Sequence, residues 1–328
     1  MNLILVLFLT EKELRESLRM EDAIPVLEFA FRRQGEGKVS MPPRMKIEGG
    51  DGRLMIMPVL IEDTPYMGLK VYTVFREVRY VILLYSAKDG SLLAIMDADY
   101  IGQVRTGAVS GVATKWMTEE GERVVGILGS GTQARTQLQA LHSIGRVEEA
   151  KVFSPNADHR RSYAKEMAQK LKTKVVAVES PREAVEGSGI VCSATPSTQP
   201  IIRSEWLSSG SHINAVGSTL PRMRELDEDT IKRARMMIVD SKEQVLAESG
   251  DIIFPVSRGL LSASEMFELG DLLLGRSRPR QSGDLTVFKS VGTALQDISV
   301  AGAAYESALK KGRGKEIGEI ASRSAASR

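Results

Sequence analysis

The chain has 328 residues and a formal net charge of +2, with 44 lysines and arginines against 42 aspartates and glutamates. This length allows two domains with a large buried core, and the balanced charge gives no electrostatic footprint for nucleic acid. We therefore expect a small-molecule partner. Cys192 is the only cysteine, which excludes disulfides within the chain and fits a reducing cytoplasm.

The apolar stretch at residues 3–9 is too short to cross a bilayer and has no positive charge before it. We expect an opening strand there, and neither a membrane helix nor a secretory signal. The three histidines, His142, His159 and His212, form no Cys/His pair at ligand spacing, so we expect no metal site.

The first third of the chain reads as an α+β unit. Thr10 followed by Glu13 has the pattern of a capping box before a helix, and a second helix is expected over residues 20–33. Strands are expected over residues 54–61, 68–75, 80–86 and 91–97. The last two are joined by a hairpin at residues 88–90, so the unit should be mostly antiparallel.

A helix at residues 107–116 leads to the most informative stretch, residues 123–134. The apolar residues Val124 to Leu128 predict a strand, which a glycine turn joins to a helix containing Leu138 and Leu141. A second strand follows at residues 150–153. This is the β-α-β context that a dinucleotide-binding fingerprint requires, and it favours a cofactor site over a glycine turn kept for packing alone.

At three positions of the fingerprint there is a physical reason for a small residue. Gly129 permits the tight turn, Gly131 lets backbone N–H groups approach a pyrophosphate, and Ala134 allows close packing of helix and strand. Ser130, Thr132 and Gln133 complete the turn. The phosphates are expected at the helix N-terminus, where unpaired N–H groups and the helix dipole favour negative charge.

Beyond the fingerprint, strands and helices alternate, with strands expected near residues 174–178, 190–193, 212–216 and 236–239. This predicts an α/β fold with a Rossmann-type, doubly wound parallel sheet that has helices on both faces. Residues 277–283 read as a loop, and a last helix over residues 291–309 is expected to pack on the first domain. We expect one domain from residues 1–115 with 297–328, and an NAD(P)-binding domain from residues 116–296.

The residues at the end of the second strand indicate whether the cofactor is NAD(H) or NADP(H). An NAD-selective site usually has an acidic residue there, whereas this chain has Ser154, Pro155 and Asn156. Ser154 and Asn156 can donate to a 2′-phosphate, and Arg160 or Arg161 could pair with it, although these arginines could equally form a solvated helix face. NADP(H) is therefore the expected cofactor, with NAD(H) possible.

Several motifs, taken in order along the chain, resemble the ornithine cyclodeaminase/mu-crystallin family. They are Met41-Pro42-Pro43-Arg44, Gly68-Leu69-Lys70, residues 104–108, Gly129 to Ala134, residues 212–217, Arg224-Glu225-Leu226-Asp227 and residues 288–292. The resemblance covers almost the whole chain. It implies a homodimer whose first domains share a β-structure, and an active site in the cleft between that domain and the Rossmann domain.

The resemblance also assigns site residues. Arg44, Lys70 and Arg105 would hold the substrate carboxylate, and Lys70 could pass a proton to a developing amine. Lys70 interrupts an apolar strand, where an ammonium without a partner is costly, whereas Arg44 follows two prolines and could be a surface charge. The cofactor would be lined by residues that the family's pattern carries over: Arg105, Ala194, Thr195, Val216, Gly217, Ser290 and Val291. Among these, Ala194 with Thr195 and Val216 with Gly217 would line the nicotinamide and its ribose.

One position departs from the family's type enzyme. Cyclodeaminases carry a catalytic aspartate in the loop after residue 217, and this chain has Thr219 there. Asp227 or Asp297 could take the role of that base, although Asp227 sits at an expected helix start, where capping is the simpler interpretation.

A reductase needs less at this position, because binding energy goes mainly into orientation and charge neutralisation. Our hypothesis is an NAD(P)H-dependent reduction of a small cyclic imino acid, Δ1-pyrroline-2-carboxylate or Δ1-piperideine-2-carboxylate, with Lys70 and Thr219 near the imine. The alternatives are reductive amination of a 2-oxo acid, as in alanine dehydrogenases of the family, ornithine cyclodeamination, and a non-catalytic, crystallin-like NADPH-binding protein.

Overall fold

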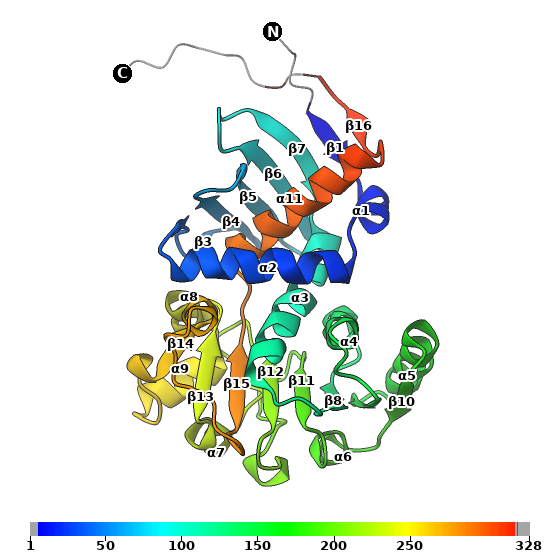
Figure 1. The fold of residues 1–328 in the computed structure, drawn as a ribbon, viewed down its shortest axis with the longest axis vertical. Helices are drawn as coiled ribbons and strands as arrows, with labels where there is room; N and C mark the ends of the chain where they lie inside the picture. Colours follow the sequence, from blue (N-terminus) through cyan, green and yellow to red (C-terminus); the bar gives the residue numbers. More distant parts are fainter. Residues whose placement is uncertain (1–5, 319, 321–328) are drawn as a thin grey trace. The chain divides into compact units, whose positions relative to one another are not determined.

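The computed structural model describes residues 6–318 and residue 320 (Figure 1). The chain forms two compact units, one from the chain up to Arg105 together with the chain from Thr293 onward, and the other from Thr106–Gly292. The expected boundaries after residues 115 and 296 instead fall inside helices α3 and α11. Within the described residues, no helix combines the length and the apolarity that a bilayer span needs.

Side-chain hydrogen bonds explain where the division falls. Arg105 bonds to Gln296 and Asp297, which both belong to the first unit. The next residue, Thr106, accepts a hydrogen bond from Gln137 of the second unit through its carbonyl oxygen. Residues 106–115, which were expected in the first domain, thus belong to the second compact unit, although their helix runs on unbroken from the first.

The first unit contains the following elements in chain order: β1 (Leu7–Leu9), α1 (Glu11–Ser17), α2 (Met20–Gly35), β2 (Val39–Ser40), β3 (Met45–Gly49), β4 (Gly52–Ile61), β5 (Tyr66–Val74), β6 (Val78–Ser86), β7 (Leu92–Asp97), the start of α3 (Asp99–Met117), α11 (Ala294–Lys310) and β16 (Lys315–Glu316). The sheet order is β16-β1-β7-β6-β5-β4-β2, with β3 on β4. Of the stretch at residues 3–9, the structure describes only the part that includes β1, and residues 3–5 lie outside the described residues.

One face of this sheet is buried under helix α11, which packs against β4, β5, β6 and α2 (Figure 1). The expected antiparallel meander is confirmed, because β4 to β7 pair with their neighbours in antiparallel register. That register aligns Lys70 on β5 with Met57 on β4 and Ile82 on β6. A charged residue thus sits in a row of apolar side chains beneath α11.

The second unit contains the rest of α3 and the following elements in chain order: β8 (Val124–Leu128), α4 (Thr132–Ser143), β9 (Glu149–Phe153), α5 (Ala157–Leu171), β10 (Lys174–Ala177), α6 (Pro181–Val185), β11 (Ile190–Ser193), η1 (Ser204–Trp206), β12 (His212–Ala215), α7 (Glu228–Arg233), β13 (Met236–Val239), α8 (Lys242–Glu248), α9 (Gly250–Ser257), η2 (Ala263–Glu265), β14 (Met266–Glu268), α10 (Leu269–Leu273) and β15 (Thr286–Lys289).

Its sheet has the order β10-β9-β8-β11-β12-β15-β13-β14, and every pairing is parallel. The chain moves outward from β8 in one direction and then resumes at β11 on the other side. This reversal is the topological switch point at which such sheets bind ligands, beyond the carboxyl ends of the strands.

Apolar side chains cover both faces of the second sheet. Ile190 and Cys192 on β11 belong to a core with helices α4 and α5, whereas Val191 between them belongs to a second core with α6 and β12. The expected doubly wound parallel sheet, beside a separate α+β unit, is therefore confirmed.

His212 links this sheet to helix α3 inside the second unit. Its ring nitrogens lie 2.9 Å from Thr286 Oγ1 and 3.3 Å from Asn214 Oδ1, and Asn214 Nδ2 donates to Thr114 Oγ1 at 2.8 Å. Burial lowers the pKa of His212 from 6.5 to about 3. The folded protein therefore holds a neutral imidazole in its core.

This histidine should make the protein sensitive to acid. The unfolded chain takes up a proton near pH 6.5 and the folded chain only near pH 3, so stability is lost as the pH falls through this window. The expected slope is about 1.4 kcal/mol per pH unit. Urea unfolding of the wild type and of His212→Gln between these pH values measures it, and the variant should show a slope shallower by that amount. Equal slopes would contradict the assignment.

Candidate active site

The first unit holds a buried ion pair on the expected Lys70. Its side chain is only 5% exposed, and Nζ donates to Asp297 Oδ2 at 2.9 Å. The ammonium also lies 5.6 and 5.5 Å from the ring centroids of Tyr72 and Tyr80. The strand delivers Lys70 to the face covered by α11, and the first turn of α11 delivers the carboxylate that the ammonium needs.

Asp297 also holds the expected Arg105. The Oδ1 atom of this fully buried carboxylate accepts from Arg105 Nε at 3.1 Å, while Arg105 Nη1 donates to Gln296 Oε1 at 3.0 Å. Adjacent residues of α11 therefore orient one guanidinium. Asp297 lies near the helix N-terminus, where the helix dipole favours a negative charge.

Arg44 completes this group. It is half-buried just before β3, its guanidinium carbon lies 5.9 Å from the Tyr72 ring centroid, and its charge acts on both Lys70 and Asp297. We call Arg44, Lys70, Arg105 and Asp297 the cationic cluster. Lys70 and Arg105 pair with Asp297, and the charge of Arg44 acts on the same carboxylate, so the three cations of the cluster outnumber its one anion, which suits a small carboxylate ligand.

The cluster changes the proton affinity of its members. Burial, together with the charges of Arg105 and Arg44, lowers the pKa of Lys70 from 10.5 to about 8, and Asp297 limits the fall. Burial alone would raise the pKa of Asp297, but Lys70 and Arg105 outweigh it and hold that pKa below its ordinary value. Lys70 can therefore release a proton close to neutral pH, while Asp297 stays ionised.

The two fingerprint positions of the second unit hold glycine for different reasons. Gly129 follows β8 with a φ of +110°, and a Cβ there would lie 2.6 Å from the carbonyl oxygen of Ala194, so the fold itself requires glycine. Gly131 has an ordinary φ of −81°, and a Cβ there would meet no protein atom within 4 Å. The protein does not need glycine at 131, which fits a ligand that approaches this backbone closely.

This contrast gives a test. Gly131→Ala is expected to change the free energy of unfolding by less than about 1 kcal/mol, because a poorer helix cap is offset by a less flexible unfolded chain. It should nevertheless weaken dinucleotide binding about tenfold or more. Gly129→Ala is the control and should destabilise the fold. Thermal unfolding and titration of cofactor fluorescence measure both effects, and an unchanged affinity in Gly131→Ala would contradict a phosphate site at this turn.

Arg135, which the sequence argument missed, supports the same turn. Its Nη1 donates to the carbonyl oxygens of Ser130 at 2.5 Å and Gly131 at 3.2 Å, while Nη2 pairs with Glu166 at 2.7 Å. Helix α4 has no side-chain cap on its first N–H groups. With the carbonyl groups held by Arg135, those N–H groups remain suited to an anion.

The end of β9 is built differently from the expectation. Ser154 Oγ accepts from Ser130 Oγ at 2.9 Å, and Asn156 caps α5 by accepting from the backbone of His159. Arg160 is buried, donates to the carbonyl oxygen of Ser154 at 3.2 Å and pairs with Glu179. Arg160 therefore supports this loop, and a 2′-phosphate would have to compete with Glu179 for it.

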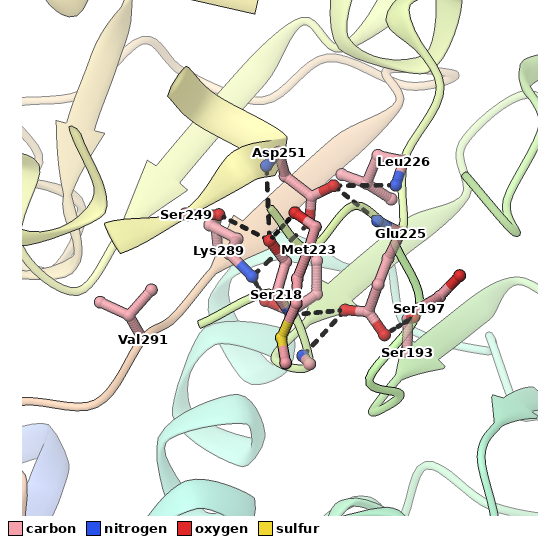
Figure 2. A network of polar contacts seen from close by, with 12 residues as sticks. Ser193, Ser197, Ser218, Met223, Glu225, Leu226, Ser249, Asp251, Lys289 and Val291 are labelled. Atoms are coloured by element: carbon pink, nitrogen blue, oxygen red, sulfur yellow. Dashed lines mark hydrogen bonds and ion pairs between the residues drawn. The ribbon is translucent and has the colours of Figure 1, made fainter. Parts of the chain in front are cut away.

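The remaining expected cofactor residues follow strands of the second unit. Ala194 and Thr195 follow β11, Val216 and Gly217 follow β12, and Ser290 and Val291 follow β15. Buried carboxylates hold these ends. Asp240 Oδ2 accepts from Ser290 Oγ at 2.7 Å and Val291 N at 3.0 Å. Glu225, which Figure 2 shows beside Ser193 and Ser218, accepts from the backbone of Thr195 and Gly217.

The proposed substitutes for the missing catalytic aspartate have other roles. Asp227 caps α7 by accepting from Thr230 N at 2.8 Å, so the capping interpretation is confirmed. Asp297 is the counter-charge of the cationic cluster. Thr219 is half-buried in the loop after β12, and it belongs to the second unit. The described residues contain no group of three or more His, Cys, Asp or Glu side chains placed to hold a metal ion.

Known proteins resemble this chain over almost its whole length. The chain is 37% identical to a Δ1-pyrroline-2-carboxylate reductase of Thermococcus litoralis, whose structure holds NADH and L-proline; the match covers 95% of this chain and all of the other, with a TM-score of 0.90. An alanine dehydrogenase of Archaeoglobus fulgidus is 33% identical, over 95% of this chain and 98% of its own length. A ketimine reductase mu-crystallin of Rattus norvegicus is 34% identical, over 92% and 96%.

The family model describes nearly the same span. Residues 6–312 match that of the ornithine cyclodeaminase/mu-crystallin family, and this span includes the cationic cluster and the strand ends of the parallel sheet. The chain belongs to the ornithine cyclodeaminase/mu-crystallin family.

Proposed function

We propose that this protein is an NAD(P)H-dependent reductase of the C=N bond of a small α-imino acid. Δ1-Pyrroline-2-carboxylate and Δ1-piperideine-2-carboxylate are the first candidates, with L-proline and L-pipecolate as products. The observation that carries the proposal is the cationic cluster, in which a buried ammonium with a pKa of about 8 lies among two guanidinium groups and one carboxylate.

Each member of the cluster has a defined task in this reaction. Arg44 and Arg105 bind the substrate carboxylate, because guanidinium groups suit that anion. Lys70 donates a proton to the substrate nitrogen, and Asp297 orients Lys70 and Arg105 and stays ionised. When bound, the nicotinamide cofactor supplies the hydride that the imine carbon receives. One hydride and one proton together convert the imine to the amine.

The second unit provides the groups for the cofactor. The turn from Gly129 to Ala134 and the N-terminus of α4 suit the pyrophosphate, and Arg135 holds the turn in shape. Either nicotinamide cofactor fits the features described. The preference for NADP(H) stays a proposal, because Arg160 already pairs with Glu179 and the Ser154 hydroxyl already bonds to Ser130 and to the carbonyl oxygen of Asn156. Comparing kcat/KM for NADPH and NADH tests it.

One alternative has specific support. Reductive amination of a 2-oxo acid uses the same cations and is the activity named for the relative from Archaeoglobus fulgidus. Ornithine cyclodeamination is less well supported, since Thr219 stands where the base is expected and Asp227 and Asp297 are engaged elsewhere. The complete cationic cluster argues against a protein that only binds the nucleotide.

One assay series separates these functions. NADPH or NADH oxidation is followed with the two cyclic imines, and with pyruvate in the presence and absence of ammonia, while ornithine is tested for release of ammonia and proline. We expect oxidation with an imine and no requirement for ammonia. A strict ammonia requirement would favour the dehydrogenase, and no oxidation with any imino acid of a broad panel would reject the proposal.

We also propose a homodimer that works in the cytoplasm. The face of the first sheet opposite α11 exposes apolar side chains, among them Leu60 at 40% and Val81 at 41%, which suits pairing of two such sheets. A single buried thiol, Cys192, fits a reducing compartment. Light scattering of the purified protein should give twice the mass of one chain, and a monomer would contradict the dimer.

A further inference from the structure

Glu225 holds together two loops at the carboxyl edge of the parallel sheet. Its side chain is fully buried, and Oε1 accepts from Ser193 Oγ at 2.5 Å, Thr195 N at 2.8 Å and Thr195 Oγ1 at 2.9 Å. Its Oε2 accepts from Gly217 N at 2.8 Å and Ser218 N at 3.1 Å (Figure 2). One carboxylate thus ties the loop after β11 to the loop after β12.

A second layer of buried charges supports Glu225. Asp251 Oδ1 accepts from Glu225 N at 2.7 Å and Leu226 N at 3.0 Å, and Asp251 Oδ2 lies 3.6 Å from Lys289 Nζ. Lys289 ends β15 and also donates to the carbonyl oxygen of Ala215 at 3.0 Å. The ends of β11, β12 and β15 are therefore joined by one network, part of which Figure 2 shows.

Stability alone is a poor reason for this network. Glu225, Asp251 and Lys289 are all fully buried, and apolar side chains of similar volume often stabilise a core as well or better. The network does bring backbones very close. A Cβ on Gly217 would lie 2.3 Å from Glu225 Oε1 and 2.4 Å from Thr195 N, so only glycine fits. Such close control of backbone position suits loops that must present a ligand in one orientation.

We propose that Glu225 is a positioning residue for the nicotinamide half of the cofactor. It sets the distance between residues 193–195 and residues 216–218, the two loops on which the nicotinamide and its ribose are expected. The adenosine half depends on a separate segment, the turn from Gly129 to Ala134, which makes no contact with Glu225 among the hydrogen bonds described. This inference rests on the proposed function, since it requires a nicotinamide dinucleotide as the ligand.

The test compares the whole dinucleotide with its adenosine half. Glu225→Gln keeps the size of the side chain but replaces one acceptor oxygen with an NH2 group, which leaves some loop N–H and hydroxyl donors without a partner. We expect the affinity for NADH or NADPH, whichever the wild type binds more tightly, to fall about tenfold or more. The affinity for ADP, or for 2′,5′-ADP if the wild type prefers NADPH, should stay within about twofold, because these ligands lack both the nicotinamide and its ribose. Fluorescence titration measures the first and calorimetry the second.

Asp227→Asn is the matched control. Asp227 lies two residues further along, and its carboxylate also accepts from backbone N–H groups, those of Thr230 and Ser204, but it touches neither loop. It should lower the melting temperature without changing either affinity. Equal weakening of both ligands in Glu225→Gln would show a merely structural role, and unchanged binding of both would also overturn the inference.

A milder variant keeps the inference testable if Glu225→Gln does not fold. Ser193→Ala removes one donor to Oε1 and leaves the charge of Glu225 paired with its other donors. It should weaken whole-dinucleotide binding about threefold and spare the adenosine half, and no difference between the two ligands would then decide against the inference. Failure of the wild type to bind NADH or NADPH would instead overturn the proposed function itself.

Discussion

Lys70→Met is expected to lower kcat/KM for imine reduction by about 10²–10⁴-fold, the range that a positioned general acid usually contributes. Methionine fills the space of the lysine stem but cannot donate a proton. Asp297 keeps Arg105 as its partner in this variant, so the buried carboxylate is not left alone. Steady-state rates with the preferred imine measure the loss. Cofactor affinity should stay unchanged, since the fingerprint turn belongs to the second unit.

The pH dependence identifies the proton donor. With a pKa of about 8, Lys70 carries its proton below that pH and loses it above, so kcat/KM for reduction should fall as the pH rises through 8. Lys70→Arg keeps a positive charge but does not titrate in this range, so its lower activity should show no such fall. The same fall in both enzymes would assign the titration to another group and would remove Lys70 from the role of acid.

The parts of the fold that could be predicted from the sequence have a clear local period. Strands β4 to β7 alternate buried and half-buried side chains over much of their length, and the fingerprint joins a buried strand to a helix through a turn at which the fold requires Gly129. Short or fully exposed elements carry no such pattern. Strand β3 is exposed at every residue, and α10 and β14 have only five and three residues. They form because neighbouring elements hold them, which no single window of sequence shows.

The cationic cluster was predictable in part. Lys70 was identified because it interrupts an apolar strand, but its partner Asp297 lies 227 residues away, and only the packing of α11 on the sheet brings them together. The same argument applied to Lys289, which follows Val287 and Phe288, would have indicated a second buried ammonium. Glu225 gave no such signal, because it lies in a polar stretch whose burial depends on the surrounding loops. Asp251 gave none either, because an acidic residue in the first turn of a helix is ordinary at the surface.

Asp297→Asn should separate catalysis from substrate binding. Removing one partner of a buried ion pair costs about 3–5 kcal/mol if the other stays charged, and Lys70 can avoid much of this cost by losing its proton. If proton loss avoids about 3 kcal/mol of this cost, the pKa of Lys70 falls by about two units. The fall in kcat/KM that begins near pH 8 in the wild type should therefore move to about pH 6. At pH 8, where half of the wild-type Lys70 and about 1% of the variant's Lys70 carry the proton, the variant should be about 50-fold slower than the wild type.

Substrate affinity should respond differently from the rate. Asparagine removes the only carboxylate of the cationic cluster, so Arg44 and Arg105 still attract the substrate carboxylate and KM should not rise with the loss of kcat. Gln296→Met is the matched control, since Gln296 is the adjacent buried residue of α11 and also bonds to Arg105, but carries no charge. Gln296→Met should leave the pH at which kcat/KM falls unchanged. A profile that stays at pH 8 in Asp297→Asn, or moves equally in Gln296→Met, would show that Asp297 does not set the proton affinity of Lys70.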